Sequence, residues 1–114
     1  MKIETRLEGK IVIIKPQGEY TILHEQNLSL HDIVKDHIEK GYKSCILSLE
    51  EVSFLDSSGI GDIFASYVSL NETGGKLAAV VTQKRIRLVF QMIKVDKVFG
   101  VYDSIEEAKE NLSP

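Results

Sequence analysis

The sequence is poor in cysteine and proline and has no tryptophan: Cys45 is the only cysteine, and there are two prolines. A single cysteine excludes an intramolecular disulfide, and its neighbours Ile46 and Leu47 indicate a buried apolar side chain rather than a reactive thiol. No run approaches the roughly 20 apolar residues of a membrane-spanning helix. The first six residues contain no apolar run and an early acid, which argues against a signal peptide. We therefore expect a cytoplasmic protein without a membrane span.

Strong charge of either sign is also missing. The chain has 14 Lys and Arg against 17 Asp and Glu, a formal net charge of −3. This charge is too small to draw the protein to nucleic acid or to an anionic membrane by its field alone. With 114 residues, of which 43% are hydrophobic, the chain can bury one core. Because it shows no linker or internal repeat, we expect a single domain over residues 1–114.

Hydrophobic patterns predict strands that alternate with helices. A hairpin is expected around Gly9, followed by helices at the 3.6-residue apolar period and by short apolar strands. The expected strands are Lys2 to Leu7, Ile11 to Ile14, Tyr42 to Leu49, Lys76 to Val81 and Lys97 to Tyr102. The expected helices are Thr21 to Lys40, with a start near Leu23 or Asn27, Ile60 to Leu70, Gln83 to Ile93 with Thr82 as its cap, and a last helix capped by Ser104. The order β-β-α-β-α-β-α-β-α predicts an α/β fold with a small mixed sheet and packed helices.

Segment 55–61, LDSSGIG, is the most informative part of the chain, because it joins a strand-like run to a helix. Asp56, Ser57 and Ser58 are all good N-cap residues, so a well-capped helix is the simplest interpretation. The two glycines cost about 1 kcal/mol each relative to alanine, however, and a cap does not require them. The free N–H groups and dipole of a helix N-terminus favour an added phosphate. A serine here can therefore be modified without unfolding its helix, which predicts a phosphorylation switch.

The helix after Asp56 has little charge on its outer side. Apolar residues at helical spacing, Phe64 among them, are expected to face inward, and the only charge before Glu72 is Asp62. The outer positions are small and include Gly59, Gly61, Ala65 and Ser66. Such a side allows a partner protein to approach closely, which predicts a docking surface. The alternative is that another element of the same chain covers it.

Other chemistry fits the sequence less well. The nucleophile elbow requires Gly-x-Ser-x-Gly, and a phosphate-binding loop requires a lysine that does not follow Gly59-x-Gly61. His24 and His31 are seven residues apart, about 10 Å along a helix, which is too far for one metal ion. We therefore expect no catalytic activity, no cofactor and no metal.

A basic cluster lies at the start of the helix expected from Gln83. Lys84, Arg85 and Arg87 occupy its first turns, where cations oppose the helix dipole. Such a position can mark a contact with an anionic partner, although a solvated face is the commoner explanation. Leu88 and Met92 are expected on the side away from the core and could extend a docking surface.

These residues carry a resemblance to a known family. Gly18-Glu19-Tyr20 before a helix, the strand at residues 46–49 and the segment VSFLDSSGIG at 52–61 resemble the STAS domain of bacterial anti-sigma factor antagonists. The resemblance implies a mixed sheet with helices and a phosphoacceptor at Ser57. It implies phosphorylation by an anti-sigma factor that is also a serine kinase, reversal by a phosphatase, and release of a sigma factor by the unphosphorylated form. Asp56, Ser58 and Gly59 would then belong to the partner-binding surface, and the domain itself would catalyse nothing.

Thr21 departs from the family pattern. Typical antagonists carry an aspartate at this position, near the kinase and nucleotide surface, so Thr21 is a further candidate contact residue. The departure favours an alternative, a constitutive interaction subunit of a signalling scaffold or transport complex that is not phosphorylated. The sequence leaves the oligomeric state open, a homodimer included.

Overall fold

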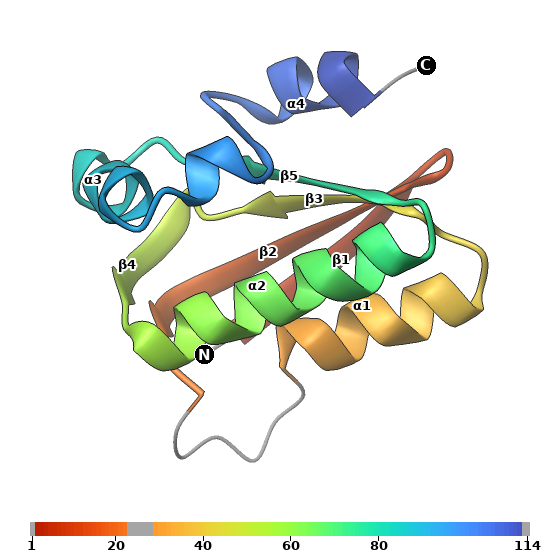
Figure 1. The fold of residues 1–114 in the computed structure, drawn as a ribbon, viewed down its shortest axis with the longest axis horizontal. Helices are drawn as coiled ribbons and strands as arrows, with labels where there is room; N and C mark the ends of the chain where they lie inside the picture. Colours follow the sequence, from red (N-terminus) through yellow and green to blue (C-terminus); the bar gives the residue numbers. More distant parts are fainter. Residues whose placement is uncertain (1, 23–28, 113–114) are drawn as a thin grey trace.

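The computed structural model describes residues 2–22 and 29–112, which form a six-stranded sheet and four α-helices (Figure 1). The strands are β1 (Lys2–Glu8), β2 (Ile11–Tyr20), β3 (Ser44–Ser48), β4 (Glu51–Leu55), β5 (Lys76–Val80) and β6 (Gly100–Tyr102). The helices are α1 (Leu30–Glu39), α2 (Ser57–Glu72), α3 (Lys84–Met92) and α4 (Ile105–Leu112), with a 3₁₀ turn η1 (Val95–Lys97) after α3. The predicted mixed α/β fold class is confirmed.

The sheet combines one antiparallel hairpin with parallel pairs. Strands β1 and β2 pair antiparallel, and the order β1-β2-β3-β5-β6 continues in parallel. Strand β4 lies outside this path and pairs in parallel with the last residues of β2, Gln17 to Tyr20. Because β4 leads directly into α2, this pairing brings the end of β2 beside the start of α2.

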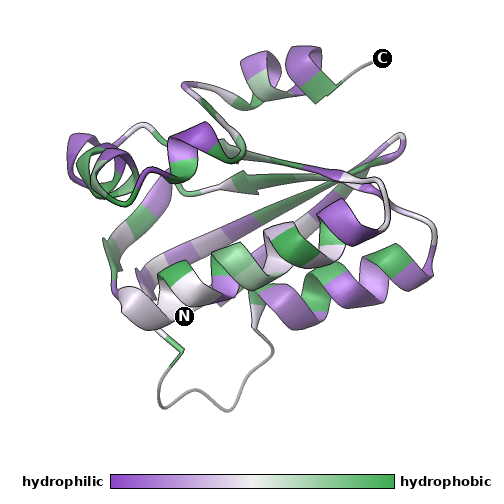
Figure 2. Ribbon diagram, viewed as in Figure 1, coloured by the Kyte–Doolittle hydropathy of each residue, from purple (hydrophilic) through white to green (hydrophobic). Residues whose placement is uncertain are grey.

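Helices cover both faces of the sheet. Figure 1 shows α1 and α2 side by side on one face and α4 on the other. The larger core lies under α1 and α2, and a smaller cluster around Ile46 lies under α4. Strands β3 and β5 are hydrophobic along most of their length, whereas the first turn of α2 has nearly neutral hydropathy (Figure 2). The start of α2 is therefore placed by polar contacts more than by apolar packing.

The local stop and cap signals are mostly correct. Gly41 and Gly74 follow α1 and α2 with φ of 97° and 77°, the left-handed region that glycine adopts freely. Ser104 caps α4, since its hydroxyl accepts from the amide of Glu107 over 3.1 Å. Helix α1 begins at Leu30, with Ser29 and Asp32 forming a capping box. The expected starts at Leu23 and Asn27 lie outside the described residues.

Three predicted details are wrong. Strand β4 was not expected, because five residues with a weak alternation carry little signal and its partner β2 is distant in sequence. Helix α3 has Gln83 rather than Thr82 at its N-cap, and the side chain of Gln83 makes no capping hydrogen bond to the helix. The last strand begins at Gly100 rather than at Lys97, because the chain first makes the turn η1.

Candidate functional site

The start of α2 is built around the side chain of Asp56. This residue is the N-cap, with an extended backbone, and its Oδ1 accepts from the amide of Gly59 over 3.0 Å. The hydroxyl of Ser58 donates to the same oxygen over 2.6 Å, and the hydroxyl of Thr21 donates to Oδ2 over 2.6 Å. These hydrogen bonds from Ser58, then Thr21, then the Gly59 amide lower the pKa of Asp56 to about 2. Asp56 is therefore ionised at neutral pH, and both of its oxygens are occupied.

The two serines of the motif have different surroundings. Ser58 is half-buried, and besides donating to Asp56 its oxygen accepts from the amide of Ile22 over 2.8 Å. Its Oγ also lies 3.3 Å from Oγ1 of Thr21. Ser57 is exposed, and its hydroxyl has no partner among residues 2–22 and 29–112. The hydroxyl of Ser57 is therefore accessible and unpaired within the described residues, whereas Ser58 is held in a contact that we name the clamp, made of Thr21, Asp56, Ser58 and the Ile22 amide.

The clamp gives Thr21 a role that the sequence did not reveal. Thr21 directly follows β2, and its hydroxyl joins that strand end to the N-cap of α2, 35 residues further along the chain. No spacing rule links the two residues. A hydroxyl can donate to Asp56, whereas an aspartate at this position could not, since an ionised carboxylate only accepts.

Gly59 is buried, and the packing inside the chain explains it. A Cβ atom at this position would lie 2.6 Å from the carbonyl oxygen of Tyr20 and 2.7 Å from Cδ1 of Leu55. Glycine therefore allows α2 to approach the end of β2 closely. Gly61 is different, because it is exposed and a Cβ atom there would meet nothing within 4 Å. The fold does not require glycine at Gly61.

The expectation that Asp62 and Ser66 lie on an open outer side is wrong. Asp62 is only 9% exposed, and its carboxylate accepts from the hydroxyl of Tyr20 over 2.7 Å and from the first amides of α1. Ser66 is fully buried, and its hydroxyl donates to the carbonyl of Asp62 over 2.9 Å. Helix α1 covers this side of α2, which was the alternative left open by the sequence. Ala65 is half-buried.

The exposed side of α2 is a different one and contains Phe64, which was expected to face inward but is 43% exposed. Ser57, Gly61, Phe64 and Val68 are all exposed and follow one another at spacings of four, three and four residues. Residues at these spacings lie on one face of a helix. We name these four residues the docking stripe. The helical periodicity of the sequence predicts this exposed face only if the side of α2 that contains Asp62 and Ser66 is assigned to the core.

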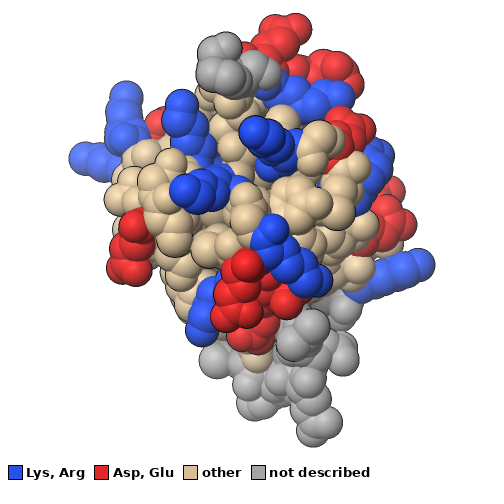
Figure 3. Space-filling model, turned by 90° about the vertical axis from the view of Figure 1, so that its right-hand side faces the viewer, with Lys and Arg blue, Asp and Glu red and all other residues tan. Residues whose placement is uncertain are grey.

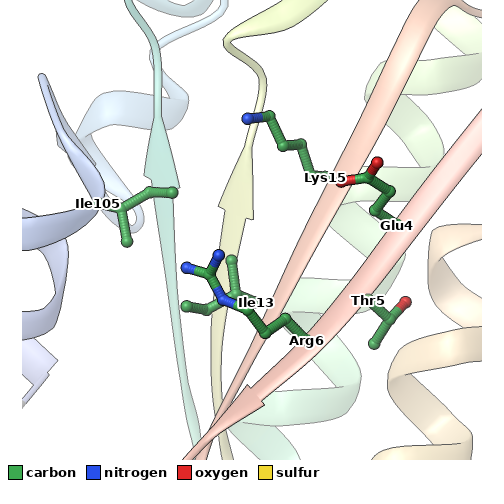
Figure 4. A pocket seen from close by; sticks show the side chains of 6 residues that line it. All are labelled: Glu4, Thr5, Arg6, Ile13, Lys15 and Ile105. Carbon is green, nitrogen blue, oxygen red and sulfur yellow. The ribbon is translucent and has the colours of Figure 1, made fainter.

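The sheet face opposite α2 carries a hollow. A hollow of about 410 Å³ is lined by Glu4, Thr5, Arg6, Ile13, Lys15 and Ile105 (Figure 4). Ile13 and Ile105 belong to the cluster under α4, so the hollow lies on the sheet face opposite α2. On the face shown in Figure 3, basic and acidic side chains are interspersed. Within the described residues, no helix is long and apolar enough to cross a membrane, and no three acidic, His or Cys side chains are grouped for a metal ion.

Comparison with known proteins assigns the chain to a family. The sequence model of the STAS domain family matches residues 2–108 of the chain. The chain belongs to the STAS domain family. A relative of this STAS protein from Paenibacillus polymyxa, an anti-sigma F factor antagonist, is 32% identical over 107 residues, which cover 91% of this chain and 88% of the relative. The family resemblance inferred from the sequence is confirmed.

Solved structures agree with this assignment. A crystal structure of a candidate anti-sigma factor antagonist from Thermotoga maritima has a TM-score of 0.81 at 25% identity and covers 96% of this STAS protein and 93% of its own chain. The Bacillus cell fate determinant SpoIIAA in its phosphorylated form has a TM-score of 0.74 at 23% identity, with 98% of this chain and 100% of the other covered. The second comparison shows the shared fold.

Proposed function

We propose that this STAS protein is a cytoplasmic, phospho-switched anti-sigma factor antagonist. In its unphosphorylated form it binds an anti-sigma factor that is also a serine kinase, and this binding releases a sigma factor. Phosphorylation of Ser57 ends the complex, and a phosphatase restores it. The observation that supports this proposal best is the contrast between the exposed, unpartnered Ser57 and the clamped Ser58. The anti-sigma factor antagonists among its relatives support the general role.

The fold can accept a phosphate at Ser57. This residue is the first of α2, where backbone N–H groups have no partner within the helix and the dipole favours negative charge. A phosphate adds about −1.5 to −2 charges at pH 7. The carboxylate of Asp56, the preceding residue, repels this charge, so the gain from the dipole is partly offset. We expect a phosphorylated domain with little change in structure.

The same phosphate would oppose the docking of a partner on α2. The docking stripe places Ser57 four residues from Gly61 and in line with Phe64 and Val68. Gly61 permits a close approach, and the two apolar side chains offer surface that a partner can bury. A doubly charged group in such a contact would have to lose its water next to Asp56. Phosphorylation therefore acts on binding rather than on folding.

The geometry supports a regulator and not an enzyme. A nucleophilic serine needs a base within hydrogen-bond reach, and none of the described residues bonds the hydroxyl of Ser57. The carboxylate of the preceding residue, Asp56, already accepts three hydrogen bonds from Ser58, Thr21 and Gly59. The kinase would thus supply the catalytic groups, and this protein would supply the acceptor.

The proposal is tested by phosphorylation in vitro. The purified chain is incubated with radiolabelled ATP and, one at a time, the anti-sigma factor kinases encoded in its source genome. We expect one kinase to label the wild type and Ser58→Ala, and to leave Ser57→Ala unlabelled. Labelling of Ser57→Ala would show that Ser57 is not the phosphoacceptor. Absence of labelling with every kinase, together with retained binding to one of them, would favour the constitutive interaction subunit.

A further inference from the structure

Helix α3 and the segment after it expose several large apolar side chains. Met92 is 78% exposed and Leu88 is 49% exposed, and Ile93 and Val98 are exposed as well. Single exposed apolar residues are common on protein surfaces. Here, however, four lie within 11 residues of sequence on one short element and its continuation. Such a group marks a candidate interaction surface.

The same element concentrates positive charge. Residues 84–97 hold five of the 14 basic residues of the chain and one of its 17 acidic residues. Arg87 is used inside the fold, since it donates to the carbonyl of Val81 and pairs with Asp103. The other four, Lys84, Arg85, Lys94 and Lys97, are exposed, and the described part of the chain offers them no acidic partner. The apolar residues of α3 therefore lie between unpaired cations at both ends.

Folding does not explain these cations. Lys84 and Arg85 occupy the first turn of α3, where positive charge opposes the dipole, and the N-cap Gln83 does not cap the helix with its side chain, which donates to the carbonyl of Glu50 instead. Acidic residues at these positions would stabilise the helix. Residues that lower local stability without a structural gain are expected at functional sites.

This surface is continuous with the docking stripe. Phe64 of the stripe and Ile93, the C-cap residue of α3, line the same apolar seam, together with buried residues of the core. The stripe from Ser57 to Val68 is about 16 Å long at the rise of an α-helix. A standard protein interface buries about 800 Å² on each partner, equivalent to a disc roughly 32 Å across. A partner that covers the stripe would therefore extend over α3.

We propose that α3 and the segment after it form a second part of the docking surface, made of Lys84, Arg85, Leu88, Met92, Ile93 and Lys97, and that this surface binds an acidic segment with an apolar anchor on the partner protein. The identity of that partner as the kinase of Ser57 rests on the proposed function. The charge and apolar chemistry of α3 do not depend on it. An anionic membrane has related chemistry, but α3 has only nine residues and the whole chain is net acidic, which disfavours a membrane surface.

The experiment uses the ¹⁵N-labelled full chain and synthetic peptides as probes. One peptide of about 15 residues carries leucines at helical spacing and glutamates elsewhere, and a second replaces the glutamates by lysines. Vesicles of phosphatidylcholine with phosphatidylglycerol form the third probe. We expect the acidic peptide alone to shift amide resonances of α3 and of the docking stripe. We expect the double variant Lys84→Glu, Arg85→Glu to weaken its binding by about tenfold and to reduce the dependence on salt.

Matched controls separate binding from folding. Leu88→Ser should weaken binding, whereas Leu7→Ser, at an equal 49% exposure on β1, should not. The double variant Lys10→Glu, Lys35→Glu makes the same charge change away from α3 and should bind as the wild type. Lys84→Glu, Arg85→Glu should keep or raise the melting temperature, because acidic residues suit the first turn of a helix. Loss of binding in a variant of unchanged or higher stability cannot come from unfolding.

The outcomes distinguish this proposal from the switch at Ser57. Equal binding of both peptides, shifts on another face, or no shift at all would overturn the acidic docking surface. Binding to vesicles in place of the acidic peptide would identify a membrane surface and also overturn it. If the acidic peptide binds α3 while no kinase labels Ser57, the proposed docking surface is supported and the proposed switch is contradicted. If Ser57 is labelled but α3 does not bind the peptide, only the proposed docking surface is contradicted.

Discussion

The phenol of Tyr20, the last residue of β2, donates a 2.7 Å hydrogen bond to Oδ2 of the buried Asp62 on α2. The same carboxylate accepts from the amides of Leu30 and His31, the first two residues of α1. A side chain of α2 thus caps α1 and ties both helices to the end of β2. Burial, and then the neighbouring carboxylate, raise the pKa of Tyr20, so the phenol stays protonated as a donor.

Replacing Asp62 should lower stability rather than act on binding directly. Asp62→Ala leaves the Tyr20 hydroxyl and two amides of α1 without their acceptor. Each unsatisfied buried donor costs about 1–3 kcal/mol, so we expect the free energy of unfolding to fall by about 3 kcal/mol or more. Asp62→Asn keeps an acceptor oxygen and should lose less. Urea unfolding measures both. If Asp62→Ala keeps the stability of the wild type but loses partner binding, Asp62 is a partner-contact residue after all.

The two glycines at the start of α2 should respond in opposite directions. Gly59→Ala places a Cβ atom against the Tyr20 carbonyl oxygen and should destabilise the protein by about 1–3 kcal/mol through overpacking. Gly61→Ala meets open space and should stabilise it by up to about 1 kcal/mol through helix propensity. Thermal unfolding of the two variants is the test. A destabilised Gly61→Ala would contradict the exposed position of that residue.

The clamp predicts a pH-dependent contribution to stability. Because the pKa of Asp56 is lowered to about 2 in the folded protein, its contribution is present above the ordinary carboxyl pKa of about 4 and is lost as the pH falls through about 2. Thr21→Val removes one of the hydroxyl donors, so the pKa of Asp56 should rise toward its ordinary value. Thr21→Ser should keep it low. A carboxyl ¹³C NMR titration measures this directly, and an unchanged pKa in Thr21→Val would exclude the contact.

The serines of the motif should differ in stability before any partner is added. Ser57→Ala and Ser57→Asp should change the free energy of unfolding by no more than about 0.5 kcal/mol, as expected for exposed residues. Ser58→Ala loses the bonds to Asp56 and to the Ile22 amide and should cost about 1–2 kcal/mol. Differential scanning calorimetry compares the three variants. Equal losses in Ser57→Ala and Ser58→Ala would show that Ser57 also has a structural contact.

The partner should distinguish the two changes at Ser57. Ser57→Asp places a carboxylate at the head of the docking stripe and should weaken binding to the kinase by more than tenfold, or about 1.4 kcal/mol, because the charge must be desolvated. Ser57→Ala should bind as the wild type. Isothermal titration with the labelling kinase decides this, and tight binding of Ser57→Asp would move the interface away from Ser57.

The local elements of this protein could be predicted from its residues. Apolar periods, β-branched runs and stop glycines such as Gly41 act over a few residues, so the main helices and the sheet class could be predicted. The cap at Asp56 was also readable, because its hydrogen bond reaches only three residues ahead to Gly59. These signals rest on short-range sterics and hydrogen bonds, which depend on sequence spacing alone.

Which serine of the motif has an unpaired hydroxyl depends on contacts that the fold brings from elsewhere in the chain. Ser57 and Ser58 are equivalent as cap residues, and their difference arises from Thr21 and Ile22, which lie more than 30 residues earlier in the chain. The same holds for α2, whose polar side with Asp62 and Ser66 was interpreted as exposed but packs against α1. A buried polar group is stable only when a partner satisfies it, and sequence spacing does not show a partner that the fold brings from elsewhere.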